Sequence, residues 1–524
     1  MDMMKATFNA SAIVFLIAAM LSVPSLFHLP SAPFDGPASA QDVLDWVING
    51  DVVIANETRT VNSSIIVESQ GKLTISDATL LFNISENGGK GLLVKGGGTL
   101  LMERSDLASA ERYFRPYVQI TGRATIRDST LHNLSGDWEG GGGVQILKGS
   151  DVIMTGNELY WMERDAITVS GSRPLISGND IHDNTVGIRC WEGANATLTH
   201  NNIHGNSLQG IFTSESVTIA EDNDISGSQF GLMFLHDEGA LTRNNVTSNG
   251  VGIDMDYLST LTITGNHVSK SEEFGMRIFN STPLVSDNVF EENKEGIRVT
   301  LSKAIIERND IRSNVDGIRV LGGNNTIRYN NITKNSRYGL LLTSATVVED
   351  GNYYGSGDNV NGKGRRAVEH QMDIFVKDDN GEPIQNASIT VTDDKGEVVW
   401  EDMTDEGGRN PEMFIMEYYE DSAGTVHNVT PHNIRIYFEG METDRDIDVV
   451  KDIIVTVVLR ENRTVNNIWY VPYILTAMAI LILFVGILLL WSHVSTKRKE
   501  REKEKRLARF NKKDKRGKKG RREQ

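Results

Sequence analysis

Residues 179–188 read NDIHDNTVGI, and residues 309–318 read NDIRSNVDGI. The asparagine that opens each stretch belongs to a column that returns every 21 or 22 residues: Asn157, Asn179, Asn201, Asn223, Asn244, Asn266, Asn288, Asn309, Asn330 and Asn352. The glycine near the end of each stretch belongs to a second column: Gly187, Gly210, Gly231, Gly252, Gly275, Gly296, Gly317 and Gly339. Two columns in phase at one period indicate a solenoid, in which each repeat forms one coil.

The period and the segments between the columns favour one kind of solenoid. Helical-hairpin repeats need about 33 residues or more, and the chain lacks the L-x-x-L-x-L frame of leucine-rich repeats. Short β-prone segments such as 197–199 (TLT) and 317–320 (GIRV) alternate instead with Asn, Asp, Gly and Ser, which favour turns. We therefore expect an all-β chain whose main part, residues 41–355, is a parallel β-helix. Its ten column asparagines would stack inside one turn and hydrogen-bond along the stack, with small residues replacing them over residues 50–140.

Two resemblances extend this interpretation. The pattern N-x-[IV]-x-x-N-x-x-G-[IL], seen at 179–188 and 309–318, resembles the right-handed β-helix repeats of the NosD-like family over residues 140–355. The period-two alternation of residues 371–461, with turn sequences at 379–384 (DNGEPI) and 404–407 (TDEG), resembles carboxypeptidase regulatory-like β-sandwich domains. The first resemblance implies a right-handed solenoid and the second a spacer domain after a linker at 356–370. NosD-like proteins are associated with copper delivery and transport, but this chain lacks the Met and His clustering of a copper carrier.

The two ends of the chain predict a membrane-anchored protein. An apolar run at 12–21 and the small residues 38–40 (ASA) before Gln41 resemble a secretory signal, so we expect residues 1–40 to be a signal peptide. Residues 471–491 carry no charge and are flanked by Trp and Tyr, which predicts a transmembrane helix over 468–491. Residues 492–524 are strongly basic, although the whole chain has a formal charge of −17.

This charge distribution predicts the topology. Because basic segments beside a span stay on the cytoplasmic side, the tail is expected inside and the ectodomain outside the cell. Such a basic run next to a span favours contact with lipid headgroups over nucleic acid, and no nucleic-acid partner is expected. Sequons of the N-x-S/T type are compatible with a glycosylated surface protein and begin at Asn56, Asn62, Asn83, Asn133, Asn195, Asn245, Asn280, Asn324, Asn331, Asn386, Asn428 and Asn462.

The repeat frame also sorts side chains by their direction. The residue after each column glycine should point into the coil, and the residues two and four positions after that glycine should point outward. Cys190, the only cysteine, should then point inward as a small apolar filler. The outward columns join aromatic, apolar and charged side chains, a mixture suited to sugar recognition. The predicted ligand-binding residues are Arg189, Trp191, Phe212, Asp254, Asp256, Arg277, Phe279, Arg298 and Arg319.

Three more specific hypotheses involve these columns. Asp254 and Asp256 lie roughly 6.6 Å apart along one strand, within the range of paired carboxylates in glycoside hydrolysis, although Asp254 and Arg277 would also suit a simple ion pair. Arg277, Arg298 and Arg319 stack on successive coils and would bind an acidic polysaccharide, unless Glu295 and Asp316 compensate their charges.

The third hypothesis concerns a metal. His182 and His204 occupy equivalent positions on adjacent coils and could share an ion, with Asp183 nearby. The rest of their column consists mainly of ordinary turn residues, so we expect neither a metal nor a cofactor.

These observations favour a non-enzymatic, single-pass cell-surface protein that binds polysaccharide, or another envelope component, through the exposed strand face. The alternatives are a membrane-tethered polysaccharide lyase or glycoside hydrolase using Asp254, Asp256 and Arg277, and a NosD-like envelope factor associated with a transporter.

Overall fold

The computed structural model describes residues 44–135, 142–355, 360–460 and 471–517. The predicted signal segment and the last seven residues lie outside this range. The chain forms two compact units. The first consists of residues 1–370 and 416–428, and the second of residues 371–415 and 429–524.

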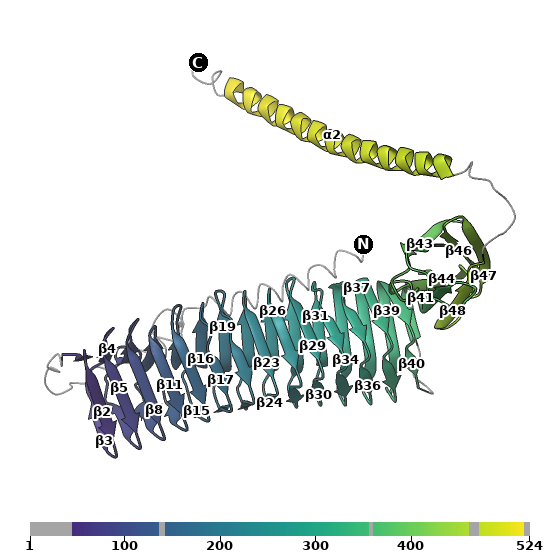
Figure 1. Ribbon diagram of the computed structural model, residues 1–524. Helices are drawn as coiled ribbons and strands as arrows, with labels where there is room; N and C mark the ends of the chain where they lie inside the picture. Colours follow the sequence, from purple (N-terminus) through teal and green to yellow (C-terminus); the bar gives the residue numbers. More distant parts are fainter. Residues whose placement is uncertain (1–43, 136–141, 356–359, 461–470, 518–524) are drawn as a thin grey trace. The chain divides into compact units, whose positions relative to one another are not determined.

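The first unit is a parallel β-helix with three strands in each coil (Figure 1). Strands that follow one another on the same side pair in parallel and in register, as in Asn202↔Asp224 and Ile203↔Ile225. The three sides are called face 1, face 2 and face 3 below. This confirms the predicted solenoid.

Face 1 contains β1 (Trp46–Ile48), β4 (Ile65–Val67), β7 (Gly91–Val94), β10 (Tyr117–Ile120), β13 (Val144–Ile146), β16 (Asp165–Ser170), β19 (Val186–Trp191), β22 (Gln209–Ser214), β25 (Phe230–Leu235), β28 (Val251–Asp256), β31 (Phe274–Phe279) and β34 (Glu295–Ser302). Face 2 contains β2 (Asp51–Ala55), β5 (Lys72–Ser76), β8 (Thr99–Glu103), β11 (Arg123–Arg127), β14 (Asp151–Thr155), β17 (Leu175–Ser177), β20 (Thr197–Thr199), β23 (Val217–Glu221), β26 (Glu238–Thr242), β29 (Thr260–Thr264), β32 (Leu284–Ser286) and β35 (Ile305–Glu307). Three long strands continue from face 1 into face 2: β37 (Asp316–Arg328), β39 (Tyr338–Asp350) and β41 (Val360–Lys377).

Face 3 is a 14-stranded parallel sheet. It contains β3 (Thr58–Val61), β6 (Thr79–Phe82), β9 (Asp106–Ser109), β12 (Thr130–His132), β15 (Glu158–Tyr160), β18 (Asp180–His182), β21 (Asn202–His204), β24 (Asp224–Ser226), β27 (Asn245–Thr247), β30 (His267–Ser269), β33 (Val289–Glu291), β36 (Asp310–Arg312), β38 (Asn331–Thr333) and β40 (Tyr353–Tyr354).

The ten column asparagines, called the ladder asparagines from here on, form the predicted stack. In each successive pair the side-chain amide donates to the next Oδ1 at 2.9–3.0 Å. The same Oδ1 accepts the backbone N–H of the preceding ladder asparagine at 2.8–3.1 Å. Ser105 and Ser129 continue this column in the first coils, because the Oγ of each accepts a backbone N–H from the coil before. The predicted replacement by small residues is thereby confirmed.

A second stack lies five residues after the first. Asn184 donates to Asn206 at 3.1 Å, and Asn293, Asn314 and Asn335 repeat the arrangement. Ser228 and Ser271 occupy this column in two coils and offer only their backbone N–H to the next asparagine. The column glycine lies beside this second stack: a Cβ on Gly275 would stand 2.8 Å from Asn293 Nδ2 and 2.6 Å from the carbonyl oxygen of Gly296. The close approach of successive coils explains the glycine.

The core fills the coil interior as the frame predicts. Every residue that follows a column glycine is at most 1% exposed, including Ile188, Leu232 and Ile297. Cys190 also points inward and is buried without a disulfide partner, and burial raises the pKa of its thiol to about 12.

The solenoid extends beyond its predicted end at residue 355. Leu340 to Glu349 of β39 pair with Val360 to Val368 of β41, with one irregularity in register. Part of the predicted linker, residues 356–370, is therefore a strand of another partial coil. The ladder column ends at Asn352, because the one asparagine of this last strand, Asn361, pairs with Leu341 on face 1 and does not lie in the column.

The second unit is a small β domain with its own core. An antiparallel sheet of four strands runs in the order β43 (Val398–Met403), β42 (Ser388–Thr392), β46 (His432–Phe438) and β47 (Met441–Ile447). The end of β41 pairs with β48 (Ile453–Val458). β44 (Phe414–Glu420) begins in this unit and forms a hairpin with β45 (Val426–Asn428), whose residues belong to the first unit. Buried side chains including Ile374, Ile389 and Ile436 form one cluster. This arrangement agrees with the predicted β-sandwich.

One helix in the described part of the chain, α2 (Val471–Gly517), is long and apolar enough to cross a membrane. An 18-residue window within its segment Thr476–Lys499 has a mean hydropathy of 2.4. The charged residues after position 496 continue the same helix.

Candidate functional site

The predicted site residues share the outer side of face 1. Strand register places one outward column through Gln119, Gln145, Thr168, Arg189, Phe212, Met233, Asp254, Arg277, Arg298, Arg319 and Leu341. Two positions further along the strands, Leu235 faces Asp256, and Phe279 faces Thr300. Trp191 ends β19 in the same orientation. The structure therefore brings all nine predicted ligand-binding residues onto one side of the solenoid.

Each arginine of this surface is paired with a carboxylate. Arg277 binds both carboxylate oxygens of Asp254 at 2.6 Å, which confirms the predicted ion pair. Arg298 binds both oxygens of Glu295 at 2.5 and 2.7 Å, and Arg319 reaches the same carboxylate at 3.2 Å.

Two further pairings differ from the prediction or were missed by it. Asp316 pairs with Arg337, in the turn before β39, and does not compensate Arg319 as expected. At the other end of the surface Asp165 holds Arg189 at 2.5 and 3.1 Å.

The strand face is less exposed than predicted. Phe212 and Met233 are 9% and 6% exposed, and Asp254 is 0% exposed. Phe212, Met233 and Val186 pack together outside the main core, with Phe230 and Leu235 beside them. Coils about 4.8 Å apart let long side chains on successive strands cover one another. An outward direction on this face consequently does not imply full exposure.

Several buried polar atoms on this side have no hydrogen-bond partner. They are Nε2 of Gln145, Nε1 of Trp191, Oε1 of Gln209 and Nε of Arg319. Gln145 and Gln209 are only 2% and 8% exposed. Because buried polar groups are nearly always paired, such atoms require an explanation. The glutamines were absent from the predicted site, although Gln145 shares the arginine column and Gln209 lies two residues before Ile211.

Asp256 has a different environment from Asp254. Burial raises the pKa of its carboxyl to about 6, with a further contribution from the neighbouring Asp254, although the Tyr257 N–H and Arg277 oppose the shift. The next two residues, Tyr257 and Leu258, both have left-handed backbone angles, with φ of 52° and 63°. The equivalent corner after β19 uses Glu192 and Gly193. A leucine in this conformation costs on the order of 1 kcal/mol or more.

A cavity of about 330 Å³ adjoins this strained corner. Its lining includes Leu258, His236 and Asp237. Asp237 itself is turned inward, where it accepts hydrogen bonds from Thr213 Oγ1 and from the Ser216 and Leu235 N–H groups. Burial raises its pKa to about 6. Asp237 thus stabilises the corner and lies away from the outer surface.

The predicted histidine pair lies on face 3 and forms part of a longer stack of rings. His132, Tyr160, His182 and His204 follow one another with ring centroids 4.9 to 5.2 Å apart and planes within 11°. Carboxylates hold the ring edges: His182 contacts Asp183 at 3.0 Å and Glu158 at 3.4 Å, and His204 contacts Asp180 at 3.0 Å. The histidines are thus adjacent, as predicted, but their nitrogens already bind carboxylates.

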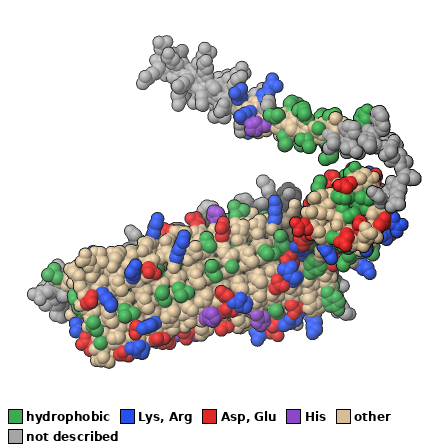
Figure 2. Space-filling view, in the orientation of Figure 1, with side chains coloured by type: hydrophobic (Ala, Val, Ile, Leu, Met, Phe, Trp, Pro, Cys, Tyr) green, Lys and Arg blue, Asp and Glu red, His purple; other side chains and the backbone are tan. Residues whose placement is uncertain are grey.

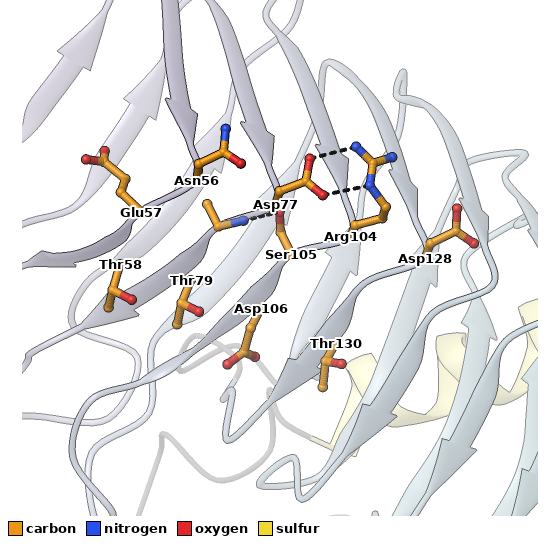
Figure 3. A pocket seen from close by; sticks show the side chains of 11 residues that line it. Asn56, Glu57, Thr58, Asp77, Thr79, Arg104, Ser105, Asp106, Asp128 and Thr130 are labelled. Atoms are coloured by element: carbon orange, nitrogen blue, oxygen red, sulfur yellow. Dashed lines mark hydrogen bonds and ion pairs between the residues drawn. The ribbon is translucent and has the colours of Figure 1, made fainter.

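A second cavity lies elsewhere, at the corner between faces 2 and 3 in the first coils (Figure 3). It has a volume of about 730 Å³, and acidic side chains and threonines line it. Figure 3 shows Arg104 bound to both oxygens of Asp77, at 2.7 and 2.8 Å. This open trough contains none of the predicted site residues.

The side of the solenoid visible in Figure 2 carries acidic and basic side chains intermixed, with scattered apolar ones. It shows no large patch of a single sign. This view therefore does not add a charged binding surface to the candidate on face 1.

Comparisons with known proteins agree with this fold. The family model described as right handed beta helix region matches residues 63–219, 116–253 and 186–322. No curated protein matches the chain.

Among solved structures, a variant of the periplasmic alginate epimerase AlgG is 17% identical, with a TM-score of 0.45, and the match covers 57% of this chain and 78% of that one. The mannuronan C-5 epimerase AlgE4 A-module of Azotobacter vinelandii is 14% identical, with a TM-score of 0.37 and coverage of 56% and 88%. The Dettilon tailspike protein is 11% identical, with a TM-score of 0.34 and coverage of 73% and 71%. These likenesses concern the fold alone. The stacked asparagines, the three-sided coils and the matched family model together identify the main part of this chain as a right-handed parallel β-helix of the PbH1 repeat type.

Proposed function

We propose that the β-helix binds an extended polysaccharide along the outer side of face 1. The observation that carries the proposal is the set of unpartnered polar atoms on Gln145, Trp191, Gln209 and Arg319. They are distributed over strands β13 to β37, about 38 Å along the solenoid at roughly 4.8 Å for each coil. A linear polymer lying along the axis would run over all of them, and its hydroxyls would supply the missing hydrogen bonds once the side chains that cover these buried atoms move aside.

The aromatic side chains of this surface support the same proposal. Trp191 and Phe279 are half-buried, and each therefore keeps part of its ring available for contact. Phe212 and Met233 form an apolar floor between the ion pairs of Arg189 and Arg277. Apolar faces next to fixed polar groups are the usual composition of a ligand site.

We further propose that the ectodomain stands outside the cell, anchored by α2 with its basic end in the cytoplasm. The apolar part of α2, which ends before Lys497, and the basic residues that follow it support this topology. A protease added to intact cells should remove the ectodomain and leave a C-terminal tag protected. Cleavage of that tag in intact cells would indicate the opposite orientation in the membrane.

N-glycosylation is part of the same proposal. The sequon asparagines Asn56, Asn62, Asn83, Asn245, Asn280, Asn324, Asn331, Asn386 and Asn428 are exposed, and Asn133 and Asn195 are half-buried. None of the ladder asparagines begins a sequon. Mass spectrometry of protein from a glycosylating host should find glycans on the exposed set. The absence of glycans from all of these asparagines would contradict the proposed N-glycosylation.

Retention tests the binding proposal. The full-length chain in detergent should be retained on at least one immobilised polysaccharide, and Trp191→Ala should weaken retention. Trp161→Ala is the matched control, because Trp161 is 56% exposed and follows β15 on face 3. An equal loss of retention for the two variants would contradict a binding site on face 1.

A second candidate function is cleavage of the bound polysaccharide. Asp256 favours it, because a carboxyl with a pKa of about 6 beside a strained corner suits a general acid. Release of reducing or unsaturated ends that Asp256→Asn abolishes would establish cleavage. Asp224→Asn on face 3 is the control, since that carboxylate is exposed. No observation in the described residues favours the transporter-associated role that the NosD-like resemblance implies.

A further inference from the structure

We infer that the ligand of face 1 is a neutral polysaccharide and not an acidic one. This inference rests on the proposed binding function and specifies its ligand class. It departs from the initial expectation that the arginine ladder recruits an anionic polymer.

The charge of the surface is the first argument. Its strands carry five carboxylates, Asp165, Asp254, Asp256, Glu295 and Asp316, and four arginines, Arg189, Arg277, Arg298 and Arg319. The surface is thus slightly acidic, and Arg337 brings it to neutrality through its pair with Asp316. A polyanion would meet no net attraction along this face.

The geometry of the arginines is the second argument. Arg189, Arg277 and Arg298 each use two nitrogens to hold one carboxylate at 2.5 to 3.1 Å. A uronate or sulfate would have to displace these partners, and displacement from Arg277 would leave Asp254 buried as an unpaired charge. Such a loss is strongly unfavourable. The guanidinium forks of Arg189, Arg277 and Arg298 are therefore already occupied.

The types of unpartnered atoms are the third argument. Gln145 Nε2, Trp191 Nε1 and Arg319 Nε are donors, whereas Gln209 Oε1 is an acceptor. A sugar hydroxyl both donates and accepts, so one neutral chain can satisfy all four atoms. A carboxylate or sulfate oxygen only accepts, so an acidic polymer would have to use its hydroxyls at Gln209. Asp256 already accepts the Tyr257 N–H at 2.8 Å, and an anionic group beside its ionised carboxylate would add repulsion.

Affinity electrophoresis of the full-length chain in detergent tests this assignment. The neutral probes are mannan, dextran and xyloglucan, and the acidic probes are polygalacturonate and alginate. We expect retardation by at least one neutral polymer, nearly unchanged between roughly 0.1 and 1 M NaCl, over which the Debye length falls from about 10 to about 3 Å. Retardation by acidic polymers alone, lost at high salt, would overturn the neutral assignment and keep polysaccharide binding. Retardation by none of them would overturn the proposed function itself.

Two conservative substitutions sharpen the result. Trp191→Phe keeps the ring and removes the unpartnered N–H, so affinity for the neutral polymer should fall about 2- to 10-fold. Arg298→Gln removes a fully paired arginine, and Glu295 keeps Arg319 as a partner. A neutral ligand then predicts a smaller loss of binding for Arg298→Gln than for Trp191→Phe, because the guanidinium is already paired with Glu295. A large loss with Arg298→Gln and none with Trp191→Phe would favour an anionic ligand.

Discussion

Replacing Asn201 by alanine should destabilise the solenoid far more than the same change at Asn202, its neighbour in the chain. Asn201 is 1% exposed. Its Oδ1 accepts the backbone and side-chain N–H groups of Asn179, both at 3.0 Å, and its amide donates to the Ile176 carbonyl at 2.9 Å and to Asn223 at 3.0 Å. Asn202 is exposed, and its side chain makes a single bond of 2.9 Å to Asp180.

The expected magnitude follows from the groups left unpaired. The backbone N–H of Asn179 loses its acceptor inside the coil, which costs about 1–3 kcal/mol. The remaining lost bonds add roughly 1 kcal/mol, because Asn179 Nδ2 keeps the carbonyls of Met154 and Ser177. The free energy of unfolding should therefore fall by about 2–4 kcal/mol for Asn201→Ala, and by at most about 0.5 kcal/mol for Asn202→Ala.

Urea denaturation followed by circular dichroism measures this difference, and hydrogen exchange of the peptide around Asn179 tests whether the loss is local. Asn201→Ser should lie between the two alanine variants, because Ser105 and Ser129 accept a backbone N–H at this position in the early coils. Equal destabilisation at positions 201 and 202, or unchanged exchange at Asn179, would refute the assigned role of the ladder.

Three other measurements follow from the titratable groups. Asp256 has a folded pKa of about 6 against an ordinary value of 3.8, so its contribution to stability should fall as pH rises from about 4 to 6, and Asp256→Asn should remove that dependence. The pKa of His182 is raised, because its bonds to Asp183 and Glu158 outweigh the opposing effect of burial. NMR should place its titration above 6.5, and the stabilisation it gives below pH 6.5 should be lost as pH rises through that pKa. Cys190 should resist thiol reagents in the folded protein and react after denaturation, because burial raises its pKa to about 12.

The sequence predicted those parts of the structure that repeat. The ladder period determines the register of each coil, so the inward direction of Ile188 and the outward direction of Arg189 follow from strand alternation. The pair between Asp254 and Arg277 follows from the same register, because the two residues face each other on adjacent strands.

Features that depend on side-chain length and conformation were not predicted. Asp316 pairs with Arg337, which lies in a turn. The periodicity of the strands does not indicate which side chain a turn residue will contact. The burial of Phe212 and Met233 results from packing between coils. The extra strand β41 has no ladder asparagine to reveal it. The second asparagine stack is a different case, since Asn184 and Asn314 stand in the repeat pattern itself and only their bonding was overlooked.

The asparagine ladder also gives the solenoid an electrical direction. In all nine links the N–H groups point toward the C-terminal coil and the carbonyl oxygens toward the N-terminal one. Aligned amides polarise one another and sum to a larger dipole, as peptide groups do in an α-helix. The ladder itself thus has a positive end toward Asn352 and a negative end toward Asn157, and a single reversed amide would set donor against donor on one side and acceptor against acceptor on the other. Any coil inserted into this array would have to adopt the same direction as its neighbours.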